Sequence, residues 1–220
     1  MKFCLFVLFS VFMSLGITNC VFNDDIEITS DFSYEEIEKI DPVIALGYYT
    51  LISDDVFPLH IMELKANLIR KNVLVSNPVY GEFINPEKIG ESVNIIIQSP
   101  GGKVDIGAQL IMILNSLRSA GIKVNCYVSE AQSMAFSVMV TSCDKIIAKK
   151  DVILMQHRIS YGKGKTTVDT FVSDIKLAYA EADALEIDRK EWLSITKTKE
   201  DKVFSYDEII KYKLVDEWID

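Results

Sequence analysis

The stretch "VNIIIQSPGGKVDIGAQLIMILNSLRSAG", residues 93–121, changes its hydrophobic pattern abruptly at a pair of glycines. Residues 93–99 form a short and almost continuously apolar run, which is typical of a strand buried on both faces. Beyond Gly102, apolar residues recur at i, i+4, i+7, i+8 and i+11 from Ile106, and Gly121 follows the last of them. This spacing predicts an amphipathic helix that ends near Gly121. The stretch therefore predicts a strand, a tight turn and a helix in succession.

The same alternation continues through the rest of the chain. A second buried strand, residues 122–130, precedes a very apolar helix over 133–143. Strands that alternate with helices are typical of right-handed βαβ units around a parallel sheet, so the sequence predicts an α/β fold with a mainly parallel sheet. The other predicted elements are a strand over 43–53, a helix over 53–71, a loop over 77–92, two short strands within 145–160, one long helix over 166–195, and a capped helix with a short strand over 205–219.

The composition is that of a folded and acidic protein. The chain has 220 residues, enough for one domain with a full hydrophobic core, and its 49% apolar and 25% charged residues argue against disorder. The formal net charge of -9 repels phosphate backbones, so nucleic acid is not expected as a partner. The sequence contains no CxxC pair and no His/Cys cluster, so we predict neither a metal site nor a cofactor.

Residues 1–22 differ in kind from the rest of the chain. Lys2 precedes an almost unbroken apolar run from Phe3 to Ile17, which is short for a membrane span but suits the core of a signal peptide. We therefore expect cleavage and export, with an uncleaved membrane anchor or lipid attachment at Cys20 as alternatives. Without such a signal the protein would be cytoplasmic. An acidic and exposed arm, residues 23–43, is expected before a single domain over 44–220.

Two of the four cysteines, Cys126 and Cys143, lie in the predicted domain. Both have apolar neighbours, so they suit two buried thiols. They also suit a disulfide in an oxidising compartment, and the sequence does not decide between these states because it does not give the distance between their Cα atoms.

Two strand-to-helix turns carry residues that suit nucleophilic catalysis. In the first turn, Gly101 and Gly102 lack side chains, so another group can approach their backbone N–H donors, as an oxyanion hole requires. The second turn places Ser133 where a strand ends and a helix begins. A serine there is either a nucleophile with an exposed hydroxyl or an ordinary N-cap, and the turn alone does not separate the two.

His157 completes the set of residues that could react together. The chain has only two histidines, and His60 on the early predicted helix suits a structural role. His157 instead ends a predicted strand just before a glycine-containing turn, as a side chain that faces a cleft would. Because a serine is a weak nucleophile until a neighbouring base takes its proton, His157 is the candidate base for Ser133.

These pieces occur in an order that resembles the proteolytic subunit of the ATP-dependent Clp protease, the ClpP family within the wider ClpP/crotonase fold. In that family a strand ends in NSPGG, the nucleophile lies in ASM, the base lies in HQP or a similar motif, and a tail of the type RD…A.EA..YGLVD supplies an acid. The corresponding segments here are QSPGG at 98–102, QSM at 132–134, QHR at 156–158 and EDKVFSYDEIIKYKLVD at 200–216. The resemblance covers about residues 44–219. It implies repeated β-β-α units and a protruding handle helix.

The resemblance also implies a role for each matching residue. Ser133 would be the nucleophile and His157 the general base of a serine peptidase. Gly102 and Met134 would supply the N–H groups of the oxyanion hole, and Asp201 would orient the histidine. The substrates implied are peptides or unfolded proteins, bound as an extra strand. The implied assembly is a homo-oligomeric ring, a heptamer or stacked heptamers.

Several departures from the family pattern keep other functions open. Glu200 could replace Asp201 as the acid. Ser129 and Gln132 stand where the family has glycine and alanine, so a catalytically impaired scaffold ring is an alternative. Lys176 could serve a Ser-Lys dyad like that of exported signal-peptide peptidases. A crotonase-type acyl-CoA enzyme is the remaining alternative. The signal-like and acidic N-terminal segments replace the apolar pore loops of the family, which argues against docking of an ATP-driven unfoldase.

Overall fold

The computed structural model describes residues 32, 34–46, 57–79, 81–159, 168–196 and 201–219. The predicted signal segment and about half of the acidic arm, residues 23–31 and 33, lie outside these residues. Among the helices within the described ranges, none combines the length and the apolar composition that a membrane crossing requires.

A mainly parallel sheet forms the centre of the domain. The strands β1 (Ile44–Leu46), β4 (Ser92–Ser99), β5 (Lys123–Gln132) and β6 (Lys145–Gln156) lie side by side in that order, and each pair is parallel. β8 (Glu217–Ile219) is parallel to the first half of β6, and β7 (Lys202–Val203) is antiparallel to its end. The α/β fold class predicted from the sequence is therefore confirmed.

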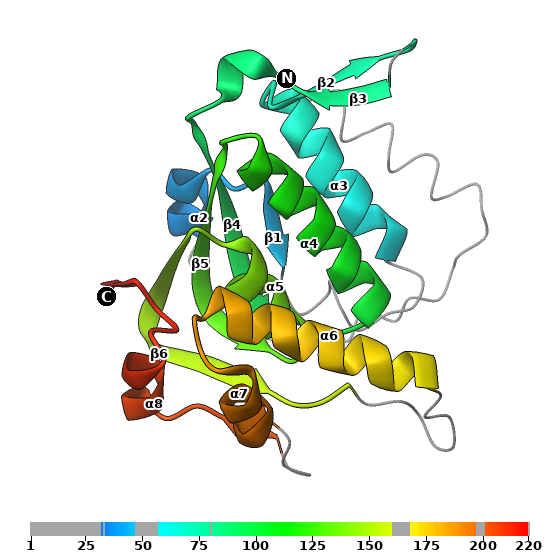
Figure 1. Cartoon of the computed structure of the whole chain (residues 1–220). Helices are drawn as coiled ribbons and strands as arrows, with labels where there is room; N and C mark the ends of the chain where they lie inside the picture. Colours follow the sequence, from blue (N-terminus) through cyan, green and yellow to red (C-terminus); the bar gives the residue numbers. More distant parts are fainter. Residues whose placement is uncertain are drawn as a thin grey trace, which may run out of the picture.

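Helices connect these strands as the crossovers of a parallel sheet. α3 (Phe57–Arg70), α4 (Val104–Ser119) and α5 (Met134–Ser142) each lie between two parallel strands in the chain. Figure 1 shows α3 and α4 side by side over one face of the sheet. The apolar spacing of α4 is realised as predicted, because Ile106, Leu110, Leu114 and Leu117 are its buried residues besides Gly107. These side chains and those of β4 join one continuous core.

The prediction of one long helix over 166–195 is wrong. The segment contains α6 (Val168–Ala184) and α7 (Arg189–Thr196), separated by a turn in which Glu186 has a φ of 55°. The side chain of Asp188 then accepts hydrogen bonds from the N–H groups of Lys190 and Glu191, which starts a new helix. Figure 1 shows the N-terminal end of α6, coloured yellow, reaching away from the sheet, in keeping with the expected handle helix.

Two further segments differ from their predictions. The expected loop over 77–92 begins with a hairpin, because β2 (Leu74–Asn77) pairs with β3 (Gly81–Ile84), and a 3-10 turn η1 (Pro86–Lys88) follows. Pro78 lies in the turn between the two strands and Gly81 begins β3, while Pro86 starts the 3-10 turn. Residues 145–156 form one strand, β6, instead of two. β5 pairs with both of its halves, and the register between the two strands shifts around residues 149–152. The predicted capping box is confirmed at the start of α8 (Tyr206–Lys211).

The described end of the acidic arm packs on the domain. α2 (Tyr34–Ile40) lies between two buried residues, Phe32 and Val43, which are 1% and 0% exposed. The side chain of Asn94 on β4 donates a hydrogen bond to the carbonyl of Ile40 at 2.6 Å. Lys149 of β6 lies over the ring of Phe32 at 4.8 Å. This part of the segment is therefore attached to the sheet, in contrast to the exposed arm expected from its charge.

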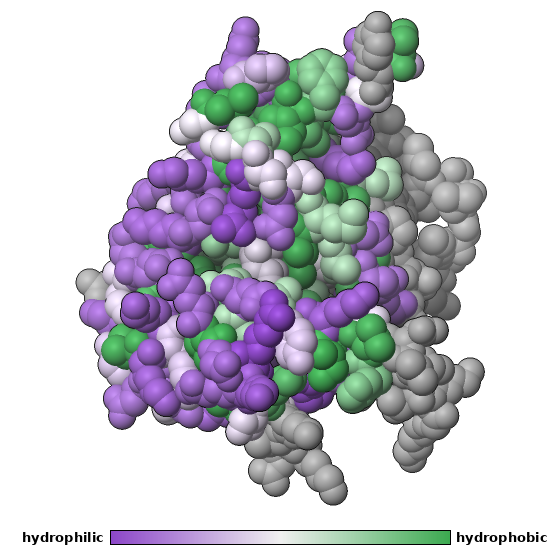
Figure 2. Space-filling view, viewed as in Figure 1, coloured by the Kyte–Doolittle hydropathy of each residue, from purple (hydrophilic) through white to green (hydrophobic). Residues whose placement is uncertain are grey.

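The surface of the domain mixes polar and apolar side chains. Figure 2 shows hydrophobic residues interspersed with hydrophilic ones on the face that carries α4 and α6. Met112 on α4 and Phe171 on α6 are among the exposed apolar residues. One face of the second half of α6 packs on the domain, because Ala178, Glu181 and Ala182 are buried.

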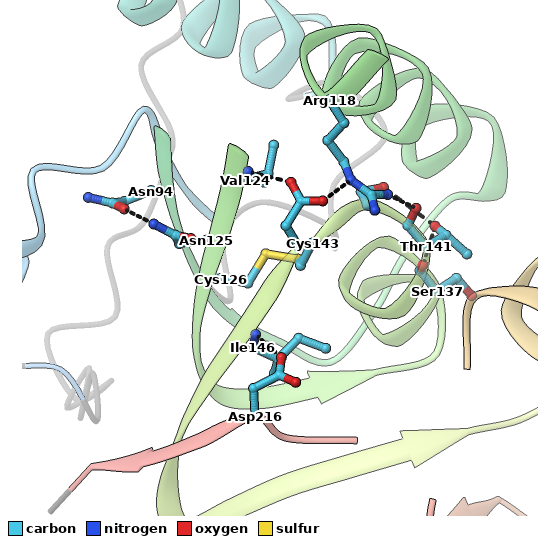
Figure 3. The surroundings of a disulfide bond; sticks show 12 residues. Asn94, Arg118, Val124, Asn125, Cys126, Ser137, Thr141, Cys143, Ile146 and Asp216 are labelled. Carbon is cyan, nitrogen blue, oxygen red and sulfur yellow. Dashed lines mark hydrogen bonds and ion pairs between the residues drawn. A yellow bond between two sulfur atoms is a disulfide. The ribbon is translucent and has the colours of Figure 1, made fainter. Parts of the chain in front are cut away.

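A disulfide joins Cys126 on β5 to Cys143, the residue that ends α5 (Figure 3). The two Cα atoms are 5.9 Å apart, within the usual range for a disulfide. Beside it, Arg118 of α4 donates to the carboxylate of Asp144 and to the carbonyl of Thr141. The same carboxylate accepts the N–H of Val124. The end of α5 is thus fastened to both β5 and α4.

We expect reduction of this disulfide to destabilise the domain. A cross-link that closes a loop of this length stabilises a folded protein by about 3 kcal/mol. Dithiothreitol should therefore lower the urea midpoint of the wild-type protein. The double variant Cys126→Ala/Cys143→Ala should have a urea midpoint as low as that of the reduced wild type, and dithiothreitol should not change it. Equal midpoints for the oxidised wild type and the double variant would contradict this expectation.

Candidate active site

Ser133 occupies a strained turn between β5 and α5. Its φ of 53° and ψ of -123° lie in a region that non-glycine residues rarely adopt, at a cost of about 1–3 kcal/mol. The N–H of Ser133 donates to the carbonyl of Met155 on β6 at 2.8 Å, and its carbonyl accepts the N–H of Ser137 at 3.2 Å. The backbone is thus held from both sides. The hydroxyl makes no capping hydrogen bond to α5, so Ser133 stands at the N-cap position without acting as a side-chain cap.

The first glycine of the PGG turn packs directly against this serine. A Cβ atom placed on Gly101 would lie 2.5 Å from the Cβ of Ser133 and 2.8 Å from the carbonyl oxygen of Gln132. Gly101 also has a φ of 104°, which side chains disfavour. Only glycine therefore allows the end of β4 to come this close to the turn at Ser133.

A cavity of about 300 Å³ opens beside the turn and brings together four of the five predicted site residues, without Asp201. Gly102 contributes from the segment after β4, Ser133 and Met134 from the start of α5, and His157 from the end of β6. Met134 is the first residue of α5, and an N–H in the first turn of a helix has no carbonyl acceptor within the helix. The arrangement can therefore present backbone donors to a negative charge that develops beside Ser133.

The ring of His157 is oriented by backbone rather than by a carboxylate. Its Nδ1 lies 2.6 Å from the carbonyl oxygen of Arg158. Because a carbonyl only accepts, Nδ1 carries the proton in this pair, and Nε2 of the neutral ring is left with a free lone pair. The backbone N–H of His157 donates to Oε1 of Gln156 at 3.0 Å. Among the described residues, no hydrogen bond joins His157 to Ser133.

Asp201, the predicted orienting acid, is near His157 in the backbone but is not joined to it within the described residues. Gln156 pairs with Lys202 in the antiparallel ladder of β6 and β7, so Asp201 lies one step further along the same register, opposite His157. The side chain of Asp201 is exposed. Within the part of the chain that the structure describes, it makes no hydrogen bond to the histidine, whose Nδ1 pairs with the Arg158 carbonyl. Glu200 lies outside the described residues.

The unusual neighbours of Ser133 leave the cavity open. Ser129 is an extra residue in β5, because Ile97 pairs with Val128 and the next residue of β4 pairs with Glu130. The side chain of Gln132 donates to the carboxylate of Glu130, and Gln132 is not among the residues that line the cavity. The bulk of Gln132 is therefore directed along β5 and does not narrow the site.

The sequence did not point to the polar residues at the base of the cavity. These include Ser137, Gln156 and Glu181, together with the ion pair between Arg158 and Asp174. The pKa of Glu181 is raised above its ordinary value, because the effect of burial outweighs that of the hydrogen bonds from Ser137, Trp192 and Gln156. The signal that could have identified Glu181 is its spacing, because it lies one turn after Leu177 and so places an acid on the apolar face of α6.

Lys176 does not join this group. It is exposed on α6 and is absent from the residues that line the cavity, although its neighbours Leu177 and Ala178 line it. The described geometry therefore gives the Ser-Lys dyad no support.

Comparison with known proteins identifies the fold. No protein-family model matches the chain, and no curated protein matches its sequence. Among solved structures, a ClpP1 mutant from Listeria monocytogenes matches with a TM-score of 0.60 and 15% sequence identity, over 83% of this chain and 94% of that chain. The chain therefore has a ClpP-like fold, as the motifs predicted. An identity this low establishes the fold alone.

A matched pair of glycine variants tests the close packing at the turn. Gly101→Ala and Gly90→Ala both place a side chain at positive φ, but a Cβ on Gly90 meets nothing within 4 Å. We expect Gly101→Ala to lower the free energy of unfolding by about 1–3 kcal/mol more than Gly90→Ala, because it also overpacks Ser133. Urea denaturation of both proteins measures the difference. Equal losses would mean that the turn can relax around an added methyl group.

Proposed function

We propose that the protein is a serine-type endopeptidase that cleaves peptides or unfolded proteins. The observation that carries this proposal is the geometry of one cavity. Ser133 presents a hydroxyl that caps no helix, and His157 lines the same cavity with Nε2 free to accept a proton. The ClpP-like fold is consistent with the same chemistry, and the segments that carry these residues are those whose sequence resembles the motifs of that family.

The reaction proceeds through an acyl-enzyme. Nε2 of His157 takes the hydroxyl proton as Oγ of Ser133 bonds to the peptide carbonyl carbon. The N–H groups of Gly102 and Met134 stabilise the oxyanion of the tetrahedral intermediate. The C–N bond then breaks as His157 returns the proton to the leaving amine. Water, activated by the same histidine, hydrolyses the ester and frees Ser133.

Asp201 is the proposed orienting acid of the active form. Its register opposite His157 favours it, and a carboxylate at Nδ1 would stabilise the imidazolium better than the Arg158 carbonyl does. Assembly offers a means to bring the two side chains together, because we propose that the protein forms a homo-oligomeric ring like other ClpP-like proteins. Exposed Phe171 and Val172 on α6 suit contacts between copies. The proposal includes no ATP-driven unfoldase.

We also propose that the protein is exported. The N-terminal apolar run has the features of a signal peptide. The disulfide between Cys126 and Cys143 supports the same conclusion, because such bonds persist mainly in oxidising compartments.

A catalytically impaired scaffold is the second candidate function. The observation that favours it is the pairing of the His157 ring with the Arg158 carbonyl in place of the Asp201 carboxylate. In such a protein the cavity would bind peptides without cleaving them.

Covalent labelling with a fluorophosphonate probe separates these functions. We expect the wild type to be labelled, Ser133→Ala to be unlabelled, and His157→Ala to react about 10²–10⁴-fold more slowly because the general base is lost. Lys176→Ala serves as the control and should label like the wild type. If the folded wild type resists the probe, the peptidase proposal fails and the scaffold is favoured. Labelling that survives in His157→Ala but is lost in both Ser133→Ala and Lys176→Ala would favour the Ser-Lys dyad instead.

A further inference from the structure

Glu181 is the most deeply buried acid at the candidate site. It lies in the second half of α6, is 2% exposed, and contributes to the wall of the cavity that holds Ser133 and His157. Taking a carboxyl group out of water is costly unless hydrogen bonds replace the lost hydration. The peptidase chemistry described above assigns this residue no role.

The carboxyl group of Glu181 gathers donors from three other elements. Ser137 of α5 donates to Oε1 at 2.6 Å, and Nε2 of Gln156 on β6 donates to the same oxygen. Nε1 of Trp192 on α7 donates to Oε2 at 2.9 Å. All four side chains are buried. Both oxygens therefore accept, and a neutral amide in the same place would turn an N–H group toward one of these donors.

Two of these donors, Ser137 and Gln156, are also hydrogen-bonded to the backbone of Ser133 and His157. Ser137 is one helical turn after Ser133, and its N–H donates to the Ser133 carbonyl at 3.2 Å. Gln156 precedes His157, and its Oε1 accepts the backbone N–H of His157 at 3.0 Å. The same Gln156 side chain also donates to Oγ of Ser137 at 3.1 Å. One carboxyl group thus joins the helix that follows Ser133 to the strand end that carries His157.

We propose that Glu181 is a positioning residue that holds Ser133 and His157 in register, acting through Ser137 and Gln156. The inference rests on the proposed peptidase function. The bond from the Ser133 N–H to the Met155 carbonyl already joins the turn to β6, but within the described residues no hydrogen bond joins Ser133 to His157 itself. Glu181 adds a second connection, between the first turn of α5 and the residue that precedes His157. The distance between Ser133 and His157 depends on the position of α5 relative to the end of β6. Glu181 is bonded to Ser137 of α5 and to Gln156 of β6.

The test is the kinetics of inactivation by a fluorophosphonate. It gives kinact, the rate constant of the covalent step, and KI, the constant for reversible binding of the probe before that step. We expect Glu181→Gln to lower kinact by about 10-fold or more, since a misplacement of 1 Å can cost about 10²-fold in rate. KI should stay unchanged, because binding of the probe does not require the pair to be aligned. Ser137→Ala should show the same split. The double variant should be no worse than the poorer single variant, because both changes remove the same connection.

Thr141→Ala is the matched control. Thr141 is one turn further along α5, and its hydroxyl is buried and donates to the Ser137 carbonyl without reaching Glu181. It should lower the melting temperature as Ser137→Ala does but leave kinact unchanged.

Three results would overturn the inference. One is a folded Glu181→Gln that reacts at the wild-type rate, and another is a Ser137→Ala that does so. The third is a loss of kinact in Thr141→Ala that matches the loss in the other variants, since the effect would then reflect stability alone. An unreactive wild type would overturn the proposed function, and this inference with it, whereas a reactive wild type with reactive variants would overturn the inference alone.

Discussion

The close approach of the end of β4 to the turn at Ser133 is the constraint on which the candidate site depends. Any side chain on residue 101 would collide with Ser133. Ser133 itself has a backbone conformation that costs free energy. A turn of this kind persists only when its surroundings over-determine it. The parallel pairing of β4, β5 and β6 does so, since the N–H of Ser133 is bonded to β6 while its side chain faces β4.

α5 helps to keep the turn at Ser133 in place, because contacts with neighbouring elements hold the helix at both ends. At its C-terminal end, the disulfide to Cys126 and the contacts of Arg118 bind it to β5 and α4 (Figure 3). Near its N-terminal end, Glu181 connects it to β6, α6 and α7. A rigid helix between two fixed ends keeps its first turn in place, which is what a preorganised oxyanion site requires.

Most of the parallel sheet and its crossovers were predictable, because strands and helices differ in the period of their apolar residues. The run 93–99 and the spacing in α4 needed no tertiary information. The break between α6 and α7 was not predictable from that period, because the apolar pattern continues across it and the break depends on Glu186 and the cap at Asp188. The hairpin of β2 and β3 was missed because its strands are short and its turns dominate the composition.

The sequence alone determined the types of residues at the candidate site and their order: a glycine turn, a serine at a helix start and a histidine at a strand end. Only the tertiary structure decided how each of them is bonded. It showed that the Ser133 hydroxyl caps no helix, that Gln132 is bonded along β5, and that the His157 ring pairs with a backbone carbonyl. It also revealed Glu181, since a carboxyl group that joins α5, β6 and α7 depends on contacts between residues up to 44 positions apart. Local sequence patterns carry periodicity and turn chemistry, whereas the partner of a buried polar group is set by packing between elements distant in the chain.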